Sequence, residues 1–140
     1  MSDPSLQKVE SEERISRYLL RPKLFDEKAR VVYAQAFIPP KVTPELPVRQ
    51  TSVYRTQELS EDTIWRLGDE YVTALTPKRW PVLGRADLFA KDVFDAGLTV
   101  VSHPDPHPRH ADIEGWPSQD EEIEMKIAYL AHKALLVIRS

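Results

Sequence analysis

Proline outnumbers glycine in this chain, with 12 prolines and 4 glycines among 140 residues. Proline fixes the backbone φ angle and lacks an N–H donor, so an excess of it indicates stiff, non-helical connections. Seven of the prolines lie in two short segments, residues 39–47 and 104–108. We therefore expect two rigid loops, and we expect any functional site to lie where the second loop leads into His110.

Length and composition predict one domain with an ordinary apolar core, because 41% of the 140 residues are hydrophobic. A formal net charge of −3 argues against a protein whose main task is to neutralise nucleic-acid phosphates. The chain has no cysteine, which excludes disulfides and thiolate chemistry. It shows neither a secretory signal nor a membrane-spanning apolar run, so a cytoplasmic protein without membrane association is expected.

Hydrophobic periodicity predicts three helices, at residues 11–20, 61–75 and 123–135, the last behind a capping box that runs from Ser118 to Glu121. Runs of β-branched and aromatic residues predict short strands at residues 30–38, 51–56, 98–101, 110–114 and 136–138. Residues 85–90 fit either a strand or the start of a short helix. The resulting fold class is α+β: a small, mostly antiparallel sheet covered by two or three helices, with residues 1–10 flexible and residues 11–140 forming a single compact domain.

Three of the four histidines, His103, His107 and His110, lie within eight residues and are interleaved with prolines and carboxylates. Imidazole and carboxylate are the ligands that a metal site without cysteine would need. An extended His-Pro-Asp-Pro-His segment separates His103 from His107 by about 12–13 Å, too far for one metal. We therefore expect a rigid solvated loop and no cofactor, with a divalent metal on these histidines as the alternative.

Residues 110–114 alternate as in a strand, which places His110, Asp112 and Glu114 on one face. An imidazole flanked by carboxylates can act as a general base. No serine, threonine or lysine nucleophile is evidently paired with this imidazole, so the preferred interpretation is the polar outer face of an edge strand. The alternative is catalysis by His110 with Asp112, Glu114 or Asp87.

Two smaller features are interpreted structurally. Arg85 and Asp87 share one face of the segment 85–90 and are expected to pair at the surface, where an ion pair contributes little stability. Trp116 precedes the predicted capping box and is expected to pack against the helix that follows it.

Residues 14–49 are basic, with eight Lys and Arg against three Asp and Glu, a net of 8 − 3 = +5. Aromatic side chains are interspersed, which suits stacking on single-stranded bases. Lys78, Arg79, Trp80 and Arg85 form a smaller patch of the same kind. Residues 111–140 carry six acids against three bases. Pairing of the basic segment with the acidic C-terminal helix, or with a protein partner, is therefore preferred to nucleic-acid binding.

Several motifs follow one another in a fixed order. They are AFIPP at 36–40, SVYR at 52–55, LS at 59–60, IWRLG at 64–68, RAD at 85–87, GL at 97–98 and RHADIEGWP at 109–117. This series resembles a family of small uncharacterised bacterial proteins over roughly residues 30–138. The resemblance implies a bacterial single domain with no established activity. It also implies that His103 and His107 are local departures, whereas Arg55, Arg85, Asp87 and His110 lie in matching segments.

The sequence thus favours a non-enzymatic binding protein or accessory subunit of a larger bacterial assembly, such as a defence-type system, that acts through a protein partner. The alternative is a small metal- or His-dependent hydrolase or nuclease built on His110. A nucleic-acid-binding module on residues 14–49 comes third. The candidate binding residues are Arg55, Lys78, Arg79, Trp80, Arg85, Arg109 and Trp116.

Overall fold

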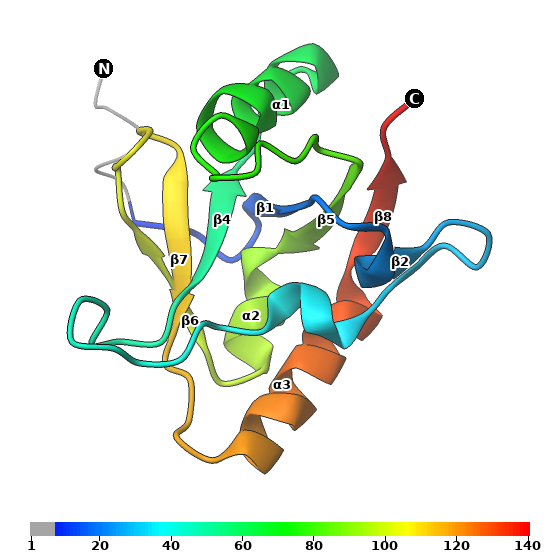
Figure 1. Cartoon of the computed structure of the whole chain (residues 1–140). Helices are drawn as coiled ribbons and strands as arrows, with labels where there is room; N and C mark the ends of the chain where they lie inside the picture. Colours follow the sequence, from blue (N-terminus) through cyan, green and yellow to red (C-terminus); the bar gives the residue numbers. More distant parts are fainter. Residues whose placement is uncertain (1–7) are drawn as a thin grey trace.

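Six antiparallel strands form a sheet in the order β6-β7-β4-β1-β5-β8 (Figure 1), in a computed structural model that describes residues 8–140. The strands are β1 (Arg14–Leu19), β4 (Thr51–Arg55), β5 (Gly84–Phe89), β6 (Thr99–Ser102), β7 (His110–Glu114) and β8 (Leu135–Ile138). Two shorter strands, β2 (Phe25–Asp26) and β3 (Val31–Val32), pair separately. The helices are α1 (Glu61–Gly68), α2 (Ala90–Asp95) and α3 (Asp120–Lys133). The expected α+β class with a small antiparallel sheet is confirmed.

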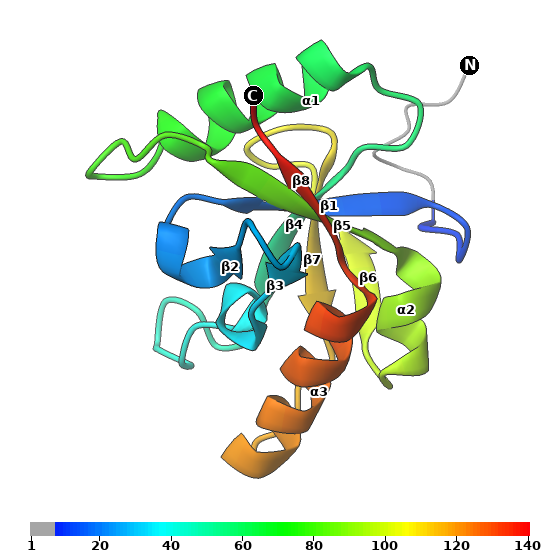
Figure 2. The same cartoon turned by 90° about the vertical axis from the view of Figure 1, so that its right-hand side faces the viewer.

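The two faces of the sheet differ in chemistry. Figure 2 shows α1 on one side of the sheet and α2 and α3 on the other. The face toward α2 and α3 is mainly apolar, and its strand residues Ile15, Leu19, Val53, Ala86, Leu88, Ala111 and Ile113 belong to the main core. The registers also place Arg17 and Arg55 on this face. Directly opposed residues of antiparallel strands share a face, so the strand registers place a polar and aromatic set toward α1. That set is Ser16, Tyr18, Ser52, Tyr54, Arg85, Asp87, His110 and Asp112.

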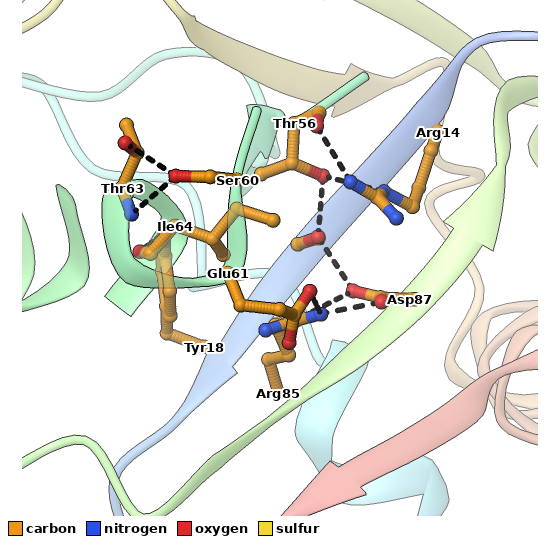
Figure 3. Close-up of polar contacts among 10 residues, drawn as sticks. Arg14, Tyr18, Thr56, Ser60, Glu61, Thr63, Ile64, Arg85 and Asp87 are labelled. Carbon is orange, nitrogen blue, oxygen red and sulfur yellow. Dashed lines mark hydrogen bonds and ion pairs between the residues drawn. The ribbon is translucent and has the colours of Figure 1, made fainter. Parts of the chain in front are cut away.

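Helix α1 lies close to the sheet because of one glycine. A Cβ atom on Gly68 would lie 2.8 Å from Cε1 of Tyr18, so a larger residue would force the two apart. The Tyr18 hydroxyl also donates to the Ile64 carbonyl at 2.5 Å, a contact between β1 and α1 (Figure 3). A π-helical turn, Asp69–Thr73, continues α1, so the expected helix at 61–75 is confirmed in large part.

Several predicted elements are correct and others are wrong. The strands expected at 51–56, 98–101, 110–114 and 136–138 and the helix expected at 123–135 are confirmed, with small shifts at their ends. The helix expected at 11–20 is wrong, because this segment is the central strand β1, with Ile15 on one covered face and Tyr18 on the other. In the segment 30–38, only Val31–Val32 is a strand, and a 3₁₀ helix, Ala34–Phe37, follows it.

The two predicted helix caps have different outcomes. Ser60 caps α1, with its hydroxyl oxygen accepting from the Thr63 backbone N–H at 3.2 Å (Figure 3). The capping box from Ser118 to Glu121 is wrong, because α3 starts at Asp120 and its cap residue, Gln119, makes no side-chain cap bond. Three acids in the first turn of α3 instead complement the positive end of the helix dipole.

The expected flexible N-terminus, residues 1–10, lies outside the described residues as far as residue 7, and Val9 packs into the main core. Within residues 8–140, no helix combines the length and the apolar character needed to cross a membrane.

The segment after β8 is joined to the π-helical turn that follows α1 by a bidentate ion pair, in which Arg139 contacts both carboxylate oxygens of Asp69 at 2.6 and 2.8 Å. Hydrogen bonds from Arg139 lower the pKa of Asp69. A lowered carboxyl pKa stabilises the fold above the ordinary Asp value of about 3.9, and this contribution is lost as pH falls through the lowered pKa. Arg139→Met should therefore lower the unfolding free energy by up to about 1 kcal/mol at pH 7, the upper end for a pair that is this exposed.

Thermal unfolding of the wild type and Arg139→Met at pH 7 and at pH 2.5 measures this difference. We expect the gap between the two melting temperatures to shrink at pH 2.5. A gap of equal size at both pH values would assign the effect to packing of Arg139 on the Trp65 ring, which lies 5.4 Å away, and not to the ion pair.

Candidate functional site

A pocket of about 670 Å³ opens where β1 and β4 diverge. The two strands pair only at Ile15 with Arg55 and at Ser16 with Tyr54. Beyond these positions the two strands are no longer paired, and the pocket is bounded in part by the π-helical turn that follows α1. The walls are mainly aromatic and aliphatic and include Tyr18, Tyr54, Tyr71, Val72, Leu75 and Trp80. Ser52 and His110 contribute polar groups to the same pocket.

Ser52 and His110 form a hydrogen-bonded pair in the pocket wall. They lie on the neighbouring strands β4 and β7, and the Ser52 Oγ atom is 2.7 Å from Nε2 of His110. The other ring nitrogen, Nδ1, lies 2.8 Å from the backbone carbonyl of His103. A carbonyl can only accept, so we assign the ring proton to Nδ1. Nε2 is then the acceptor of the Ser52 hydroxyl proton.

Asp112 lies next to this pair and is buried, with 3% of its surface exposed. Its Oδ1 atom is 3.6 Å from Nε2 of His110, and its Oδ2 atom is 3.0 Å from Nδ1 of His103. Burial raises the pKa of Asp112, and the two histidines act in the opposite direction. The expected polar outer face of residues 110–114 is therefore wrong for His110 and Asp112, which are buried beneath neighbouring elements.

The same side chains can also hold a cation. Candidate ligand atoms of His103, His110 and Asp112 all lie within 4.8 Å of one another. The expected extended conformation of this segment is wrong, because it forms the turn between β6 and β7, in which the His103 N–H donates to the His110 carbonyl. The expected separation of His103 from His107 stays a prediction. His107 is not part of this group. Its Nδ1 atom accepts from the Arg109 N–H, and its ring packs against Tyr71.

Asp87 and Arg85 lie in a second polar network, shown in Figure 3. Arg85 contacts Asp87 at 3.0 Å and Glu61 at 2.8 Å, and Ser16 donates to Asp87 at 2.6 Å. The side chains of Arg85 and Asp87 are 2% and 8% exposed. The expected surface pair is therefore wrong, because α1 covers this part of the sheet. The network joins α1, β1 and β5, and it places Asp87 with Arg85 and not with His110.

The remaining candidate catalytic residue, Glu114, accepts a hydrogen bond from Gln50 at the end of β7. Among the candidate binding residues, Arg55 pairs with Glu13 at 2.5 Å. Arg55 and Arg109 also line a separate, smaller pocket of about 290 Å³ together with four glutamates. Trp116 packs against the main core and donates from Nε1 to the Ile113 carbonyl at 2.9 Å.

The basic patch around residue 80 is partly assembled at the main pocket. Lys78 and Trp80 line this pocket, and Arg79 does not belong to its lining. Arg21 joins them, with its guanidinium carbon 4.4 Å from the centre of the Trp80 ring. The basic segment 14–49 thus contributes Arg17 and Arg21 to the pocket.

The basic segment does not pair with the acidic C-terminal helix as expected. In the described part of the chain, the acidic partners of Lys and Arg in ion pairs are Glu13, Glu61, Asp69, Asp87 and Asp95. None of these residues lies in α3, so the expected pairing is wrong for residues 8–140.

Sequence reasoning missed Ser52, Tyr54 and Arg17 as parts of the candidate site. Ser52 and His110 are 58 positions apart in the sequence and meet only because β4 and β7 are neighbours. The one available signal was the alternation in Ser52-Val53-Tyr54, which matches the polar and apolar alternation of His110-Ala111-Asp112. Comparison with known proteins finds no match to a family model, to a curated protein or to a solved structure.

Proposed function

We propose that this protein is a small hydrolase in which Ser52 is the nucleophile and His110 is the general base. The observation that supports the proposal is the 2.7 Å contact from the Ser52 Oγ atom to His110 Nε2, in the wall of a pocket large enough for a small organic substrate. A serine hydroxyl needs an adjacent base to become nucleophilic, and this base is held in the required tautomer by the His103 carbonyl.

The reaction would follow from these contacts. Ser52 attacks the ester carbon while its proton passes to His110 Nε2. The imidazolium that forms lies 3.6 Å from the Asp112 carboxylate, which stabilises the positive charge. His110 then returns the proton to the leaving alcohol as the ester bond breaks. Water then attacks the acyl group on Ser52 while His110 takes a proton from it. The bond between the acyl carbon and Ser52 Oγ breaks, His110 returns the proton to Oγ, and the free acid leaves.

A second candidate is a metal-dependent hydrolase, favoured by the grouping of His103, His110 and Asp112 within 4.8 Å. Two histidines and one carboxylate suit zinc or another transition metal, with further coordination positions open to water or substrate. The hydrogen bond from His110 Nδ1 to a carbonyl is also typical of a metal-bound histidine. A metal on Nε2 would occupy the lone pair that Ser52 uses, so the two mechanisms exclude each other.

An accessory role in a larger assembly remains a separate proposal. It is supported by apolar side chains that are exposed in the segment after the 3₁₀ helix, at Ile38, Val42, Leu46 and Val48. A protein partner could cover these side chains. Nucleic-acid binding through residues 14–49 also remains a prediction, with less support because Arg17 and Arg21 line the pocket.

Covalent labelling tests the proposed nucleophile directly. A phosphonofluoridate probe forms a bond from Ser Oγ to phosphorus and releases fluoride only where the serine is activated by a base. We expect mass spectrometry of the digested protein to find the adduct on the peptide that contains Ser52. His110→Ala should remove this labelling.

The exposed Ser118 is the internal control, because it should stay unlabelled in the same sample. Labelling of Ser118 and Ser52 to the same extent would contradict an activated Ser52. If esterase activity is lost after dialysis against a chelator and returns with Zn²⁺, the metal-dependent mechanism replaces the serine mechanism.

A further inference from the structure

Arg17 is a partly buried cation without a carboxylate partner among residues 8–140. Its Nε atom donates to the Ala36 carbonyl at 2.9 Å, and its Nη1 atom donates to the Ser52 carbonyl at 2.8 Å. These acceptors are neutral, so they satisfy hydrogen bonds without cancelling the charge. Burial also lowers the pKa of Arg17. A desolvated charge without a counter-charge is costly to maintain in a fold.

Arg17 lies where an anion could reach it. It bridges the gap between the diverging strands β1 and β4 and lines the main pocket together with Ser52 and His110. Among residues 8–140, the lining of this pocket includes two further cations, Arg21 and Lys78, and no aspartate or glutamate. The described residues of the pocket therefore offer positive charge without internal neutralisation.

The rest of the pocket suits an aromatic body. Tyr18, Tyr54, Tyr71 and Trp80 supply ring faces and edges, and the leucine and valine side chains add apolar surface. Arg21 and Lys78 lie over the Trp80 ring, at 4.4 and 5.4 Å from its centre. Both cations are thus held at the pocket by cation–π contacts and not by acids.

We infer that the pocket binds an aromatic compound that carries an oxyanion, a carboxylate or a phosphate, and that Arg17 receives this anion. The inference rests on the proposed function only for calling the ligand a substrate, because the binding chemistry is independent of Ser52. An arginine can hold either group with two parallel hydrogen bonds, and Arg17 lines the same pocket as the proposed nucleophile Ser52.

Binding to Ser52→Ala protein tests this inference without turnover. The probes are 4-nitrobenzoate for the carboxylate, 4-nitrophenyl phosphate for the phosphate and 4-nitrobenzyl alcohol as the neutral control, each titrated by calorimetry. We expect the better anionic probe to bind about 10-fold to 100-fold more tightly than the neutral alcohol, the gain typical of charge-assisted hydrogen bonds. The ranking of the two anions distinguishes a carboxylate substrate from a phosphate substrate.

Variants assign the anion to its residue. Arg17→Met should abolish the preference for the anion, whereas Arg66→Gln should keep it, because Arg66 is an exposed arginine outside the pocket. If Arg17→Met does not fold, the ¹⁵Nε signal of Arg17 in the folded Ser52→Ala protein gives the same information, and it should shift when 4-nitrobenzoate is added.

Equal affinity for the neutral and anionic probes would overturn the inference. Tight anion binding with an unchanged Arg17 signal would overturn the assignment to Arg17. The wild type can also bind the anion and yet show neither labelling at Ser52 nor esterase activity. That result would support the binding inference and contradict the hydrolase proposal, so failure of one can be distinguished from failure of the other.

Discussion

Asp87→Ala should lower the free energy of unfolding by about 3–5 kcal/mol, because it removes the buried partner of a buried arginine. Arg85 would keep only Glu61, whose side chain is 61% exposed. The Nη1 atom of Arg85 already has no hydrogen-bond partner among the described residues. Ser16 would also lose the acceptor of its 2.6 Å hydrogen bond. Thermal unfolding should show a melting temperature lower by more than about 10 °C.

Asp95→Ala is the matched control, since Asp95 pairs with Lys91 on the exposed surface of α2 at 2.6 Å. Exposed pairs with this i, i+4 spacing contribute about 0.3–0.5 kcal/mol. A loss of similar size in both variants would mean that the network under α1 is no more important than a surface pair. It would also remove our reason for interpreting Asp87 as structural.

Ser52→Ala should lower kcat for 4-nitrophenyl esters by about 10³-fold or more, the size of loss found when the nucleophile of a serine hydrolase is removed. The fold should survive, because the change deletes one hydroxyl from a partly exposed strand residue. The melting temperature and the far-ultraviolet circular dichroism spectrum should stay close to those of the wild type.

Ser118→Ala is the control for this substitution, because Ser118 is exposed and does not cap α3. Its kcat should equal that of the wild type. An unchanged kcat in Ser52→Ala would rule out Ser52 as the nucleophile. If His110→Ala still abolished activity in that case, a mechanism in which His110 binds a metal or activates a water molecule would replace the serine mechanism.

Much of the fold could be predicted from local patterns, and its exceptions have a common physical cause. The helix at 61–75 was predictable because one of its faces is solvated, which leaves the 3.6-residue period visible. Strand β1 was mistaken for a helix because it is central and covered on both faces, with Ile15 and Leu19 on one side and Ser16 and Tyr18 on the other. A strand of this kind loses the period-2 alternation that identifies strands in a sequence.

The candidate site was only half predictable. The proline-rich approach to His110 correctly indicated where polar side chains gather, and the i, i+2 spacing placed His110 and Asp112 on one face. The partner strand β4 could not be found from spacing, because strand order sets which distant segments become neighbours. The burial of Arg85 and Asp87 could not be predicted either, because their polar side chains are typical of a solvated face. Only the position of α1 over the sheet shows that they are buried.

Because β1 and β4 diverge, Arg17 also has a structural role between the two strands. In the middle of a sheet, backbone amides and carbonyls of adjacent strands normally satisfy each other. Here the Ser52 carbonyl accepts a hydrogen bond from the Arg17 guanidinium and not from a backbone amide of β1. Arg17, which lines the pocket, therefore also connects β1 to β4. If an anion binds Arg17 as we propose, its binding will therefore be coupled to the stability of the contact between β1 and β4.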